Sequence, residues 1–233
     1  MNRLPVMRQT WANIVWCHWP VDPAMVQSIL PEGLTPDLFE GKAWVGLIPF
    51  SMTNLRLPGP LSLLSKLLRV NNFGEVNVRT YVRGPDGKSG VWFCTLDSDD
   101  WLAVKTANVA FGLPYRLAKI QLTRTENQIH WVDQRQEDSA LSELEVVIKS
   151  GDSRPARLGL EQFLVERYAL YTSRRGKLFR GELEHHPWRL REGSLLLSRI
   201  GTVEKAGFRV DAEPYVLVGD PVDVTVYPLH RVG

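Results

Sequence analysis

The chain has 233 residues, of which 44% are apolar, and this is enough material for one compact core, so we expect a single domain over residues 1–233. Its 28 basic and 26 acidic side chains give a formal charge of +2, which offers no general basis for binding nucleic acid or an anionic membrane. No run approaches the roughly 18 apolar residues that span a bilayer, and polar residues interrupt the N-terminal stretch before a signal-peptide core could form. These features predict a cytoplasmic protein.

Four segments carry helical patterns. Asp22 can cap a short helix that begins at Pro23. The leucine-rich segment 61–68 favours a core or oligomer contact, so a homo-oligomer is possible in principle. The acidic stretch DSDD at 97–100 is interpreted as the cap and first turn of a helix, because no His or Glu spacing typical of a divalent-metal site accompanies it. The most regular helical pattern is LEQFLVERYALYT at 160–172.

Most of the remaining sequence has strand-like patterns. They include TWANIVWCHW, AWVGLIPFSM, a hairpin from FGEVNVRTYV to GVWFCTLD, two strands in YRLAKIQLTRTENQIHWVDQ, LEVVIK, and several runs in the final third. Strands of this number with a few inserted helices favour a barrel or sandwich over alternating βαβ units. We therefore expect a mainly antiparallel β fold, of the α+β kind, with a few flanking helices.

The strand FGEVNVRTYV has one apolar and one polar face. Its polar face carries the side chains of Glu75, Asn77, Arg79 and Tyr81, which alternate with Val76, Val78, Thr80 and Val82. On an open antiparallel sheet these polar groups would point to water, which is the commoner arrangement. In a closed barrel they could line a cavity. The pattern alone leaves both alternatives open.

A family resemblance covers most of the chain, from about His18 to about Leu190. The phrases HWPVDPAMVQSILPEGL, GKAWVGLIPFSM, EVNVRTYV, GVWFCTLD, FGLPYRLAKI, FLVERYALY and HHPWRL, in this order, resemble the YqjF-like family of uncharacterised bacterial proteins. That family is similar in fold to acetoacetate decarboxylase, whose antiparallel barrel encloses a small-molecule cavity. The resemblance implies a closed or partly closed β-barrel and a small-molecule ligand in it.

The decarboxylase uses a lysine that forms an imine with its β-keto acid, beside a second lysine that lowers the first one's pKa. In the corresponding phrase, GLPYRLA at 112–118, the resemblance places Tyr115 at the imine-forming position and Arg116 at its neighbour. A phenol cannot form an imine, and a guanidinium stays protonated at ordinary pH. Lys119 lies about 13 Å farther along the strand, at a different depth. We therefore expect no acetoacetate decarboxylase activity.

A candidate polar site survives this substitution. Glu75, Asn77 and Arg79 could orient a small carboxylate or carbonyl compound, and Tyr115 could donate a hydrogen bond or take part in proton transfer. Arg79 could hold an anion by a two-pronged contact. The alternative is that Glu75 and Arg79 form an ion pair while Tyr115 packs against a neighbour. The sequence does not separate the two.

Two further residues enter the candidate ligand-binding set through the resemblance. His18 falls near the position from which the decarboxylase supplies a substrate-binding arginine, although a hydrogen-bonded strand histidine is the alternative, and Arg116 takes the place of the second lysine. The chain has only two cysteines, far apart and without CxxC spacing, so we expect no metal, and no cofactor motif is present. Two functions remain: a binding protein for a small carboxylate or carbonyl compound, or an enzyme that acts on such a compound without an imine.

Overall fold

The computed structural model describes residues 4–58 and 72–233, so the leucine-rich segment 61–68 lies outside the described residues. The helices within these residues are α1 (Pro23–Ile29), α3 (Trp101–Phe111), α4 (Leu160–Val165) and α5 (Gly201–Lys205). The strands are β1 (Met7–Ala12), β2 (Val15–Val21), β3 (Thr35–Pro36), β4 (Ala43–Arg56), β5 (Phe73–Arg83), β6 (Ser89–Ser98), β7 (Tyr115–Arg124), β8 (Gln128–Arg135), β9 (Leu141–Ile148), β10 (Arg154–Pro155), β11 (Ala169–Arg174), β12 (Lys177–His185), β13 (Arg189–Ile200), β14 (Tyr215–Gly219), β15 (Val222–Val226) and β16 (His230–Arg231). This confirms the mainly antiparallel β fold with a few helices; among the described strands, β6 pairs in parallel with β7 and β11.

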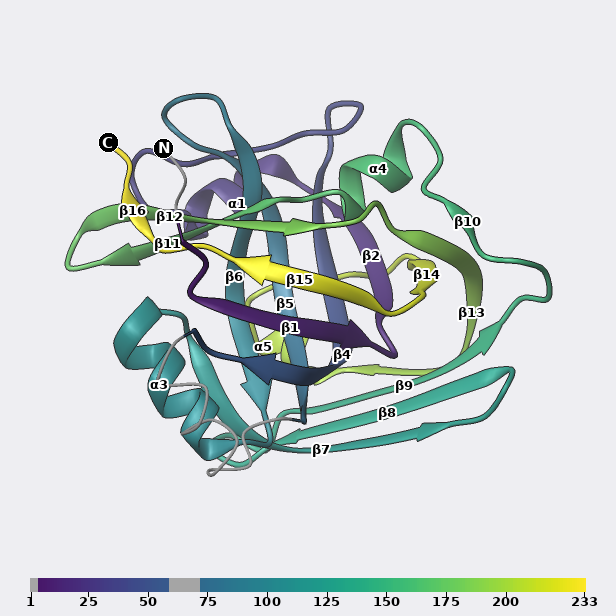
Figure 1. The fold of residues 1–233 in the computed structure, drawn as a ribbon. Coiled ribbons are helices and arrows are strands. Elements are labelled where there is room, and N and C mark those ends of the chain that lie inside the picture. Colours follow the sequence, from purple (N-terminus) through teal and green to yellow (C-terminus); the bar gives the residue numbers. More distant parts are fainter. Residues whose placement is uncertain (1–3, 59–71) are drawn as a thin grey trace.

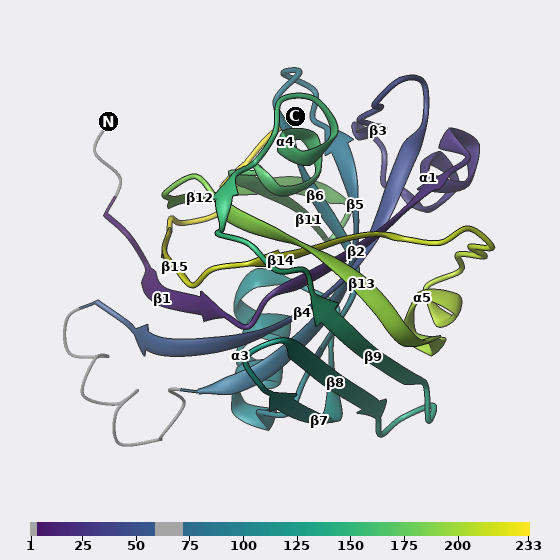
Figure 2. The ribbon, with the colours of Figure 1, turned by 90° about the vertical axis from the view of Figure 1, so that its right-hand side faces the viewer.

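The pairings close into a ring of 12 strands that β5 crosses (Figures 1 and 2). β5 lies between β4 and β6, and each of these two strands changes partners along its other edge. β4 pairs first with β2 and then with β1, while β6 pairs first with β11 and then with β7. β5 therefore divides the ring of 12 strands into two rings. The one called the larger ring here consists of β6, β7, β8, β9, β13, β14, β2, β4 and β5. The other, the smaller ring, consists of β1, β15, β12, β11, β6, β5 and β4.

Both faces of β5 are buried because the strand belongs to both rings. Val76 and Val78 pack into the apolar core of the larger ring, together with residues of β8 and β9 such as Trp131. The opposite face belongs to the smaller ring, where Tyr81 lies among Trp16, Phe50, Val224 and their neighbours. The polar face of β5 is therefore enclosed by protein and does not point to water.

The predicted helix over 160–172 is correct only up to Val165. Glu166 ends α4 with a φ of −87° and a ψ of 75°, outside the helical region, and the chain enters β11 at Ala169. Leu170 and Tyr171 then pair with both β12 and β6. Two-sided strand pairing therefore overrides the local helical pattern, as tertiary context commonly does.

The predicted cap at DSDD is confirmed at one residue and wrong at another. Asp100 is the N-cap of α3, and its carboxylate accepts a hydrogen bond from the Ala103 N–H at 2.7 Å. Asp97, in contrast, lies in β6 and is fully buried, because its side chain turns into the larger ring and pairs with Arg135. The alternation of β6, rather than the acidic composition, decides where each carboxylate points.

Candidate functional site

Tyr115 and Glu75 meet inside the protein. Tyr115 is the first residue of β7, and the side chain of Asn108 fixes its backbone with two hydrogen bonds, of 2.9 Å to the N–H and 3.0 Å to the carbonyl. The parallel pairing of β7 with β6 places Tyr115 beside Leu96, next to β5. The Tyr115 hydroxyl donates a hydrogen bond to Glu75 Oε2 at 2.6 Å. This contact joins two residues that are 40 positions apart in the chain.

The protonation of this pair is set mainly by burial. Burial raises the pKa of Glu75 to about 7, against the opposing effect of hydrogen bonds from Tyr115 and Asn77. Burial and the neighbouring Glu75 raise the pKa of Tyr115 well above its usual value. The phenol of Tyr115 therefore keeps its proton, while the carboxyl group of Glu75 is partly ionised at neutral pH. A group of this kind is suited to general acid and base catalysis.

Arg79 is a buried cation that has no carboxylate partner among the residues the structure describes. The residue is 9% exposed. Its Nη2 donates hydrogen bonds to the Leu164 carbonyl at 3.1 Å and to the Tyr81 hydroxyl at 3.4 Å. Among the described residues, no carboxylate oxygen lies within 4.0 Å of this guanidinium, and its Nε has no hydrogen-bond partner. The Glu75–Arg79 ion pair, which was one of the two alternatives from the sequence, is therefore not formed. A buried charge in this condition is costly unless an anion joins it.

The tautomer of His18 follows from the hydrogen bonds of Tyr81. The Tyr81 hydroxyl lies 2.9 Å from the Leu164 carbonyl and 2.5 Å from His18 Nε2. A carbonyl only accepts, so the single proton of Tyr81 goes to Leu164, and His18 donates from Nε2. His18 Nδ1 is then an acceptor, and it has no partner among the described residues. Burial, followed by the charge of Arg79, holds the pKa of His18 well below its usual range, so the imidazole is neutral.

The close approach of His18 to β4 depends on a glycine. A Cβ atom at Gly46 would lie 2.8 Å from His18 Nε2, which is closer than real contacts allow. Gly46 pairs with both His18 and Arg79 across β4. The glycine therefore makes room for the imidazole beside the buried cation.

Further buried polar atoms lack a hydrogen-bond partner on the side of the sheet that carries Arg79. Within the described part of the chain, they are Gln9 Oε1, Trp11 Nε1, His18 Nδ1, Trp44 Nε1, Asn77 Oδ1 and Arg79 Nε. They come from β1, β4 and β5 of the smaller ring and from the adjoining strand β2, and they include both donors and acceptors. Buried polar groups normally have partners, so these atoms indicate places for a polar ligand or water.

The structure places the predicted site residues in two hydrogen-bonded groups along β5, one around Glu75 and one around Arg79, and separates Arg116 from both. Asn77 Nδ2 lies 3.5 Å from Glu75 Oε1, which adds the amide to the Glu75–Tyr115 pair. Arg116 follows Tyr115 directly on β7, and successive strand residues point to opposite faces. Its side chain is 41% exposed and pairs with Glu137. Lys119, also considered from the sequence, is exposed.

Tyr81 is a site residue that the sequence analysis did not select. It shares the parity of Glu75, Asn77 and Arg79 on β5, and this signal was present in the sequence. It links Arg79 to His18 and to the C-terminal part of α4 through Leu164. A strict application of the two-residue period would have included it.

The larger ring holds a second buried polar group. Arg135 donates from Nε to both carboxylate oxygens of Asp97 at 3.1 Å, and from Nη2 to Thr95 at 3.0 Å. Asp133 lies beside this pair and accepts a hydrogen bond from Thr202 at 3.0 Å. Burial and the charge of Asp97 raise the pKa of Asp133 to about 8. Unlike Arg79, Arg135 is fully compensated by acidic neighbours.

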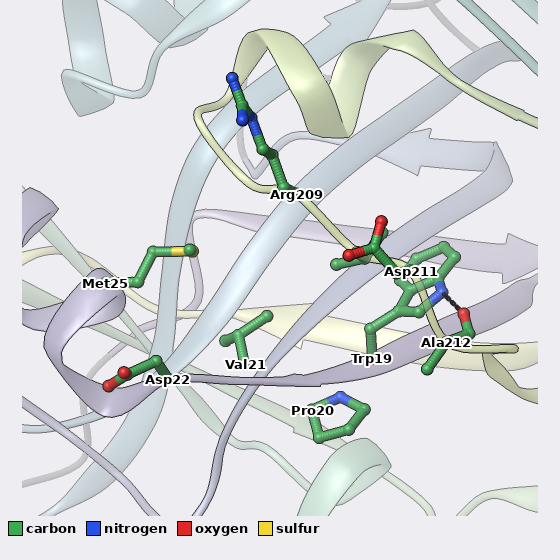
Figure 3. A pocket seen from close by; sticks show the side chains of 9 residues that line it. Trp19, Pro20, Val21, Asp22, Met25, Arg209, Asp211 and Ala212 are labelled. Atoms are coloured by element: carbon green, nitrogen blue, oxygen red, sulfur yellow. Dashed lines mark hydrogen bonds between the residues drawn. The ribbon is translucent and has the colours of Figure 1, made fainter.

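Two surface pockets lie apart from these buried groups. One, of about 240 Å³, is bordered by Trp19, Met25 and Arg209, and Figure 3 shows the Trp19 indole donating to the Ala212 carbonyl at 3.0 Å beside it. The other, of about 370 Å³, lies over β1, β4 and β15. Neither is lined by Glu75, Arg79 or Tyr115.

Within residues 4–58 and 72–233, no group of three or more His, Cys, Asp or Glu side chains is arranged to hold a metal ion. No helix in this part of the chain is long and apolar enough to cross a membrane.

Comparison with solved structures defines the class of fold. The enduracididine biosynthesis enzyme MppR has a TM-score of 0.69 at 15% identity, and the match covers 100% of this chain and 89% of the MppR chain. An acetoacetate decarboxylase-like enzyme from Sphingomonas wittichii RW1 has a TM-score of 0.69 at 14% identity, with 98% and 94% of the two chains covered. Acetoacetate decarboxylase from Legionella pneumophila has a TM-score of 0.68 at 16% identity, with 100% and 90% covered. The chain has the acetoacetate decarboxylase-like fold.

Sequence comparison gives the family. The model of the family DUF2071, described as "Uncharacterized conserved protein", matches residues 8–223. The "Uncharacterized protein YqjF" of Bacillus subtilis (strain 168) is 33% identical over 228 residues, which are 97% of this chain and 92% of that protein. The chain belongs to this family.

Proposed function

We propose that the protein binds a small carboxylate or carbonyl compound in the smaller ring, with Arg79 as the anion-pairing group. The observation that carries this proposal is the buried guanidinium of Arg79, which lies more than 4.0 Å from every carboxylate of the described residues. A carboxylate ligand would compensate the charge and accept the free N–H of Nε in a two-pronged contact. Asn77 can donate a further hydrogen bond from its amide N–H, whereas His18 Nδ1 is an acceptor and suits only a ligand that also carries a hydroxyl group.

The chemistry of this ligand does not involve an imine in our proposal. By the resemblance of the phrase at 112–118, Tyr115 stands at the position of the imine-forming lysine, and a phenol cannot form an imine. Every lysine in the described residues is exposed. One structural relative, MppR, is known in a complex with pyruvate. We use pyruvate as the first probe because it combines a carboxylate with a carbonyl group.

Binding is tested by thermal shift and calorimetry with pyruvate and other short carboxylates. We expect the midpoint temperature of thermal unfolding of the wild type to rise with ligand concentration. Arg79→Met should weaken binding by at least about tenfold, because the charge-assisted pair between the guanidinium and the carboxylate ligand is lost. The control is Arg116→Met, which removes an exposed arginine outside the compartment and should bind like the wild type. Equal affinities for wild type and Arg79→Met would refute the assignment.

A second candidate function is proton transfer to or from the ligand by Glu75. It is favoured by the carboxyl pKa of about 7 and by the hydrogen bond from Tyr115, which keeps the carboxylate in place. As a base, the Glu75 carboxylate would take a proton from the carbon beside the carbonyl group, whose oxygen receives the electron pair. Return of a deuteron from the exchanged carboxyl group would label the compound.

The test is deuterium exchange into the methyl group of pyruvate, followed by NMR. Glu75 must be ionised to act as the base, so we expect the exchange rate to rise with pH through about 7. Glu75→Gln should abolish the exchange without abolishing binding, since the amide keeps the shape of the protonated acid. Exchange that is equal in Glu75→Gln and wild type would exclude Glu75 as the base.

A further inference from the structure

Two arginines face each other on the outer side of the smaller ring. Arg8 of β1 and Arg56 of β4 are direct partners in the antiparallel pairing, where like charges normally repel. Both side chains are exposed, and neither takes part in an ion pair with any residue that the structure describes. In Figure 1, β1 lies between β15 and β4. Arg8 is the second residue of β1, and Arg56 is the last residue of β4.

A β-bulge creates this juxtaposition. The register between β1 and β4 shifts by one residue between Arg8 and Thr10, so β4 contains one extra residue there. Asn54, within the bulge, has a φ of +53°, in the left-handed region that is costly for most residues and tolerated by asparagine. Without the bulge, Leu55 would stand opposite Arg8. Bulges commonly re-aim a side chain in this way, and here the side chain is Arg56.

Neutral donors complete the surroundings of the two arginines. Asn54 Nδ2 donates to Thr10 Oγ1 at 3.3 Å, which leaves its second N–H available, and the Thr10 hydroxyl donates to Asp223 Oδ1 at 2.6 Å. These residues line the pocket of about 370 Å³, a volume in the range of small-molecule sites. The pocket therefore holds two cations against one anion, and the one carboxylate is already hydrogen-bonded.

We propose that this pocket binds the phosphate group of a small molecule. Two guanidinium groups and an amide N–H, presented from two strands, match an anion with several acceptor oxygens better than they match a planar carboxylate. Asp223 favours a phosphate that carries one proton, because Asp223 Oδ2 can accept a hydrogen bond from the protonated phosphate oxygen. The site is separate from the buried Arg79 group, because Arg8 and Arg56 are exposed and neither Arg79 nor any other residue of β5 lines this pocket.

The experiment titrates the full-length protein with inorganic phosphate and with methyl phosphate, against potassium chloride at equal ionic strength. Amide NMR shifts at Arg8, Thr10 and Arg56 report the site, and calorimetry gives the affinity. We expect saturable shifts with a phosphate compound, and Arg8→Ala or Arg56→Ala should weaken binding by about tenfold each. The matched control is Arg209→Ala, an exposed arginine at the other pocket, which should leave the affinity unchanged.

The two phosphate compounds distinguish the sources of the anion. Binding of methyl phosphate supports a phosphorylated metabolite, and binding of inorganic phosphate alone supports the free ion at the same site. Acetate that binds as tightly as phosphate, chloride that produces the same shifts, or a double Arg8→Ala/Arg56→Ala variant that still binds phosphate would each overturn the proposal. Circular dichroism of each variant establishes that the loss is local.

Discussion

Arg79→Met is expected to stabilise the ligand-free protein by about 1–4 kcal/mol, since methionine fills similar space without a charge that must be desolvated. The carbonyl of Leu164 would keep the Tyr81 hydroxyl as its donor at 2.9 Å, so the substitution leaves no new unsatisfied acceptor there. The expected gain in stability goes together with the loss of carboxylate binding. Such a trade-off is typical of a residue that serves a ligand rather than the fold.

Urea unfolding of wild type and variant measures this effect at a fixed pH. The control is Arg167→Met: this arginine is also buried, but its Nη1 pairs with Asp37 Oδ2 at 2.6 Å, and removing it leaves the buried Asp37 with Arg83, at 2.8 Å from Oδ1, as its remaining ion-pair partner among the described residues. Arg167→Met should therefore destabilise the protein, by about 1–3 kcal/mol, since Asp37 Oδ2 loses its charged donor. If Arg79→Met loses stability to a similar extent, Arg79 is a structural group and the ligand assignment loses its main support.

The alternation of β5 shows how far the sequence could be interpreted. The two-residue period predicted which side chains share a face, and in the structure Glu75, Asn77 and Arg79 are all buried side chains of β5. It could not predict that both faces are buried, because this depends on β4 and β6 each changing partners along the chain. Burial, in turn, is what raises the pKa of Glu75. The sequence therefore predicted which residues of β5 share a face, but not their burial or the raised pKa of Glu75.

Arg116 and Asp97 were misplaced for a related reason. Arg116 entered the candidate set by resemblance, although the period of a strand that begins at Tyr115 directs the two side chains to opposite faces. Asp97 was assigned to a helix cap, yet β6 extends through Ser98, and its partner Arg135 lies 38 residues away. No local sequence pattern predicts a partner that is 38 residues away in the chain. Where strand boundaries are uncertain, the direction of each polar side chain is uncertain too.

Arg135→Met is expected to have the opposite effect to Arg79→Met, a loss of about 3–5 kcal/mol, because it leaves buried carboxylates without their cation. Arg135 is 3% exposed, and it binds Asp97 through two nitrogens while Nη1 reaches Asp138 at 3.3 Å. The same substitution at Arg199 is the matched control: that arginine is 59% exposed in its pair with Glu143, so its removal should cost less than about 1 kcal/mol.

The loss should also depend on pH. Burial raises the pKa of Asp97 in the folded state, and Arg135 opposes this rise, so Arg135→Met should raise the pKa of Asp97 further. A carboxyl group whose folded pKa lies above its unfolded value of about 4 binds a proton more tightly when folded, so stability falls as the pH rises between the two values. The variant should therefore lose more stability at pH 8 than at pH 5, as measured by urea unfolding at both. Adding Asp97→Asn should recover part of the loss and flatten the pH dependence. A pH-independent loss, unchanged by Asp97→Asn, would mean that Arg135 stabilises the larger ring by packing rather than by charge.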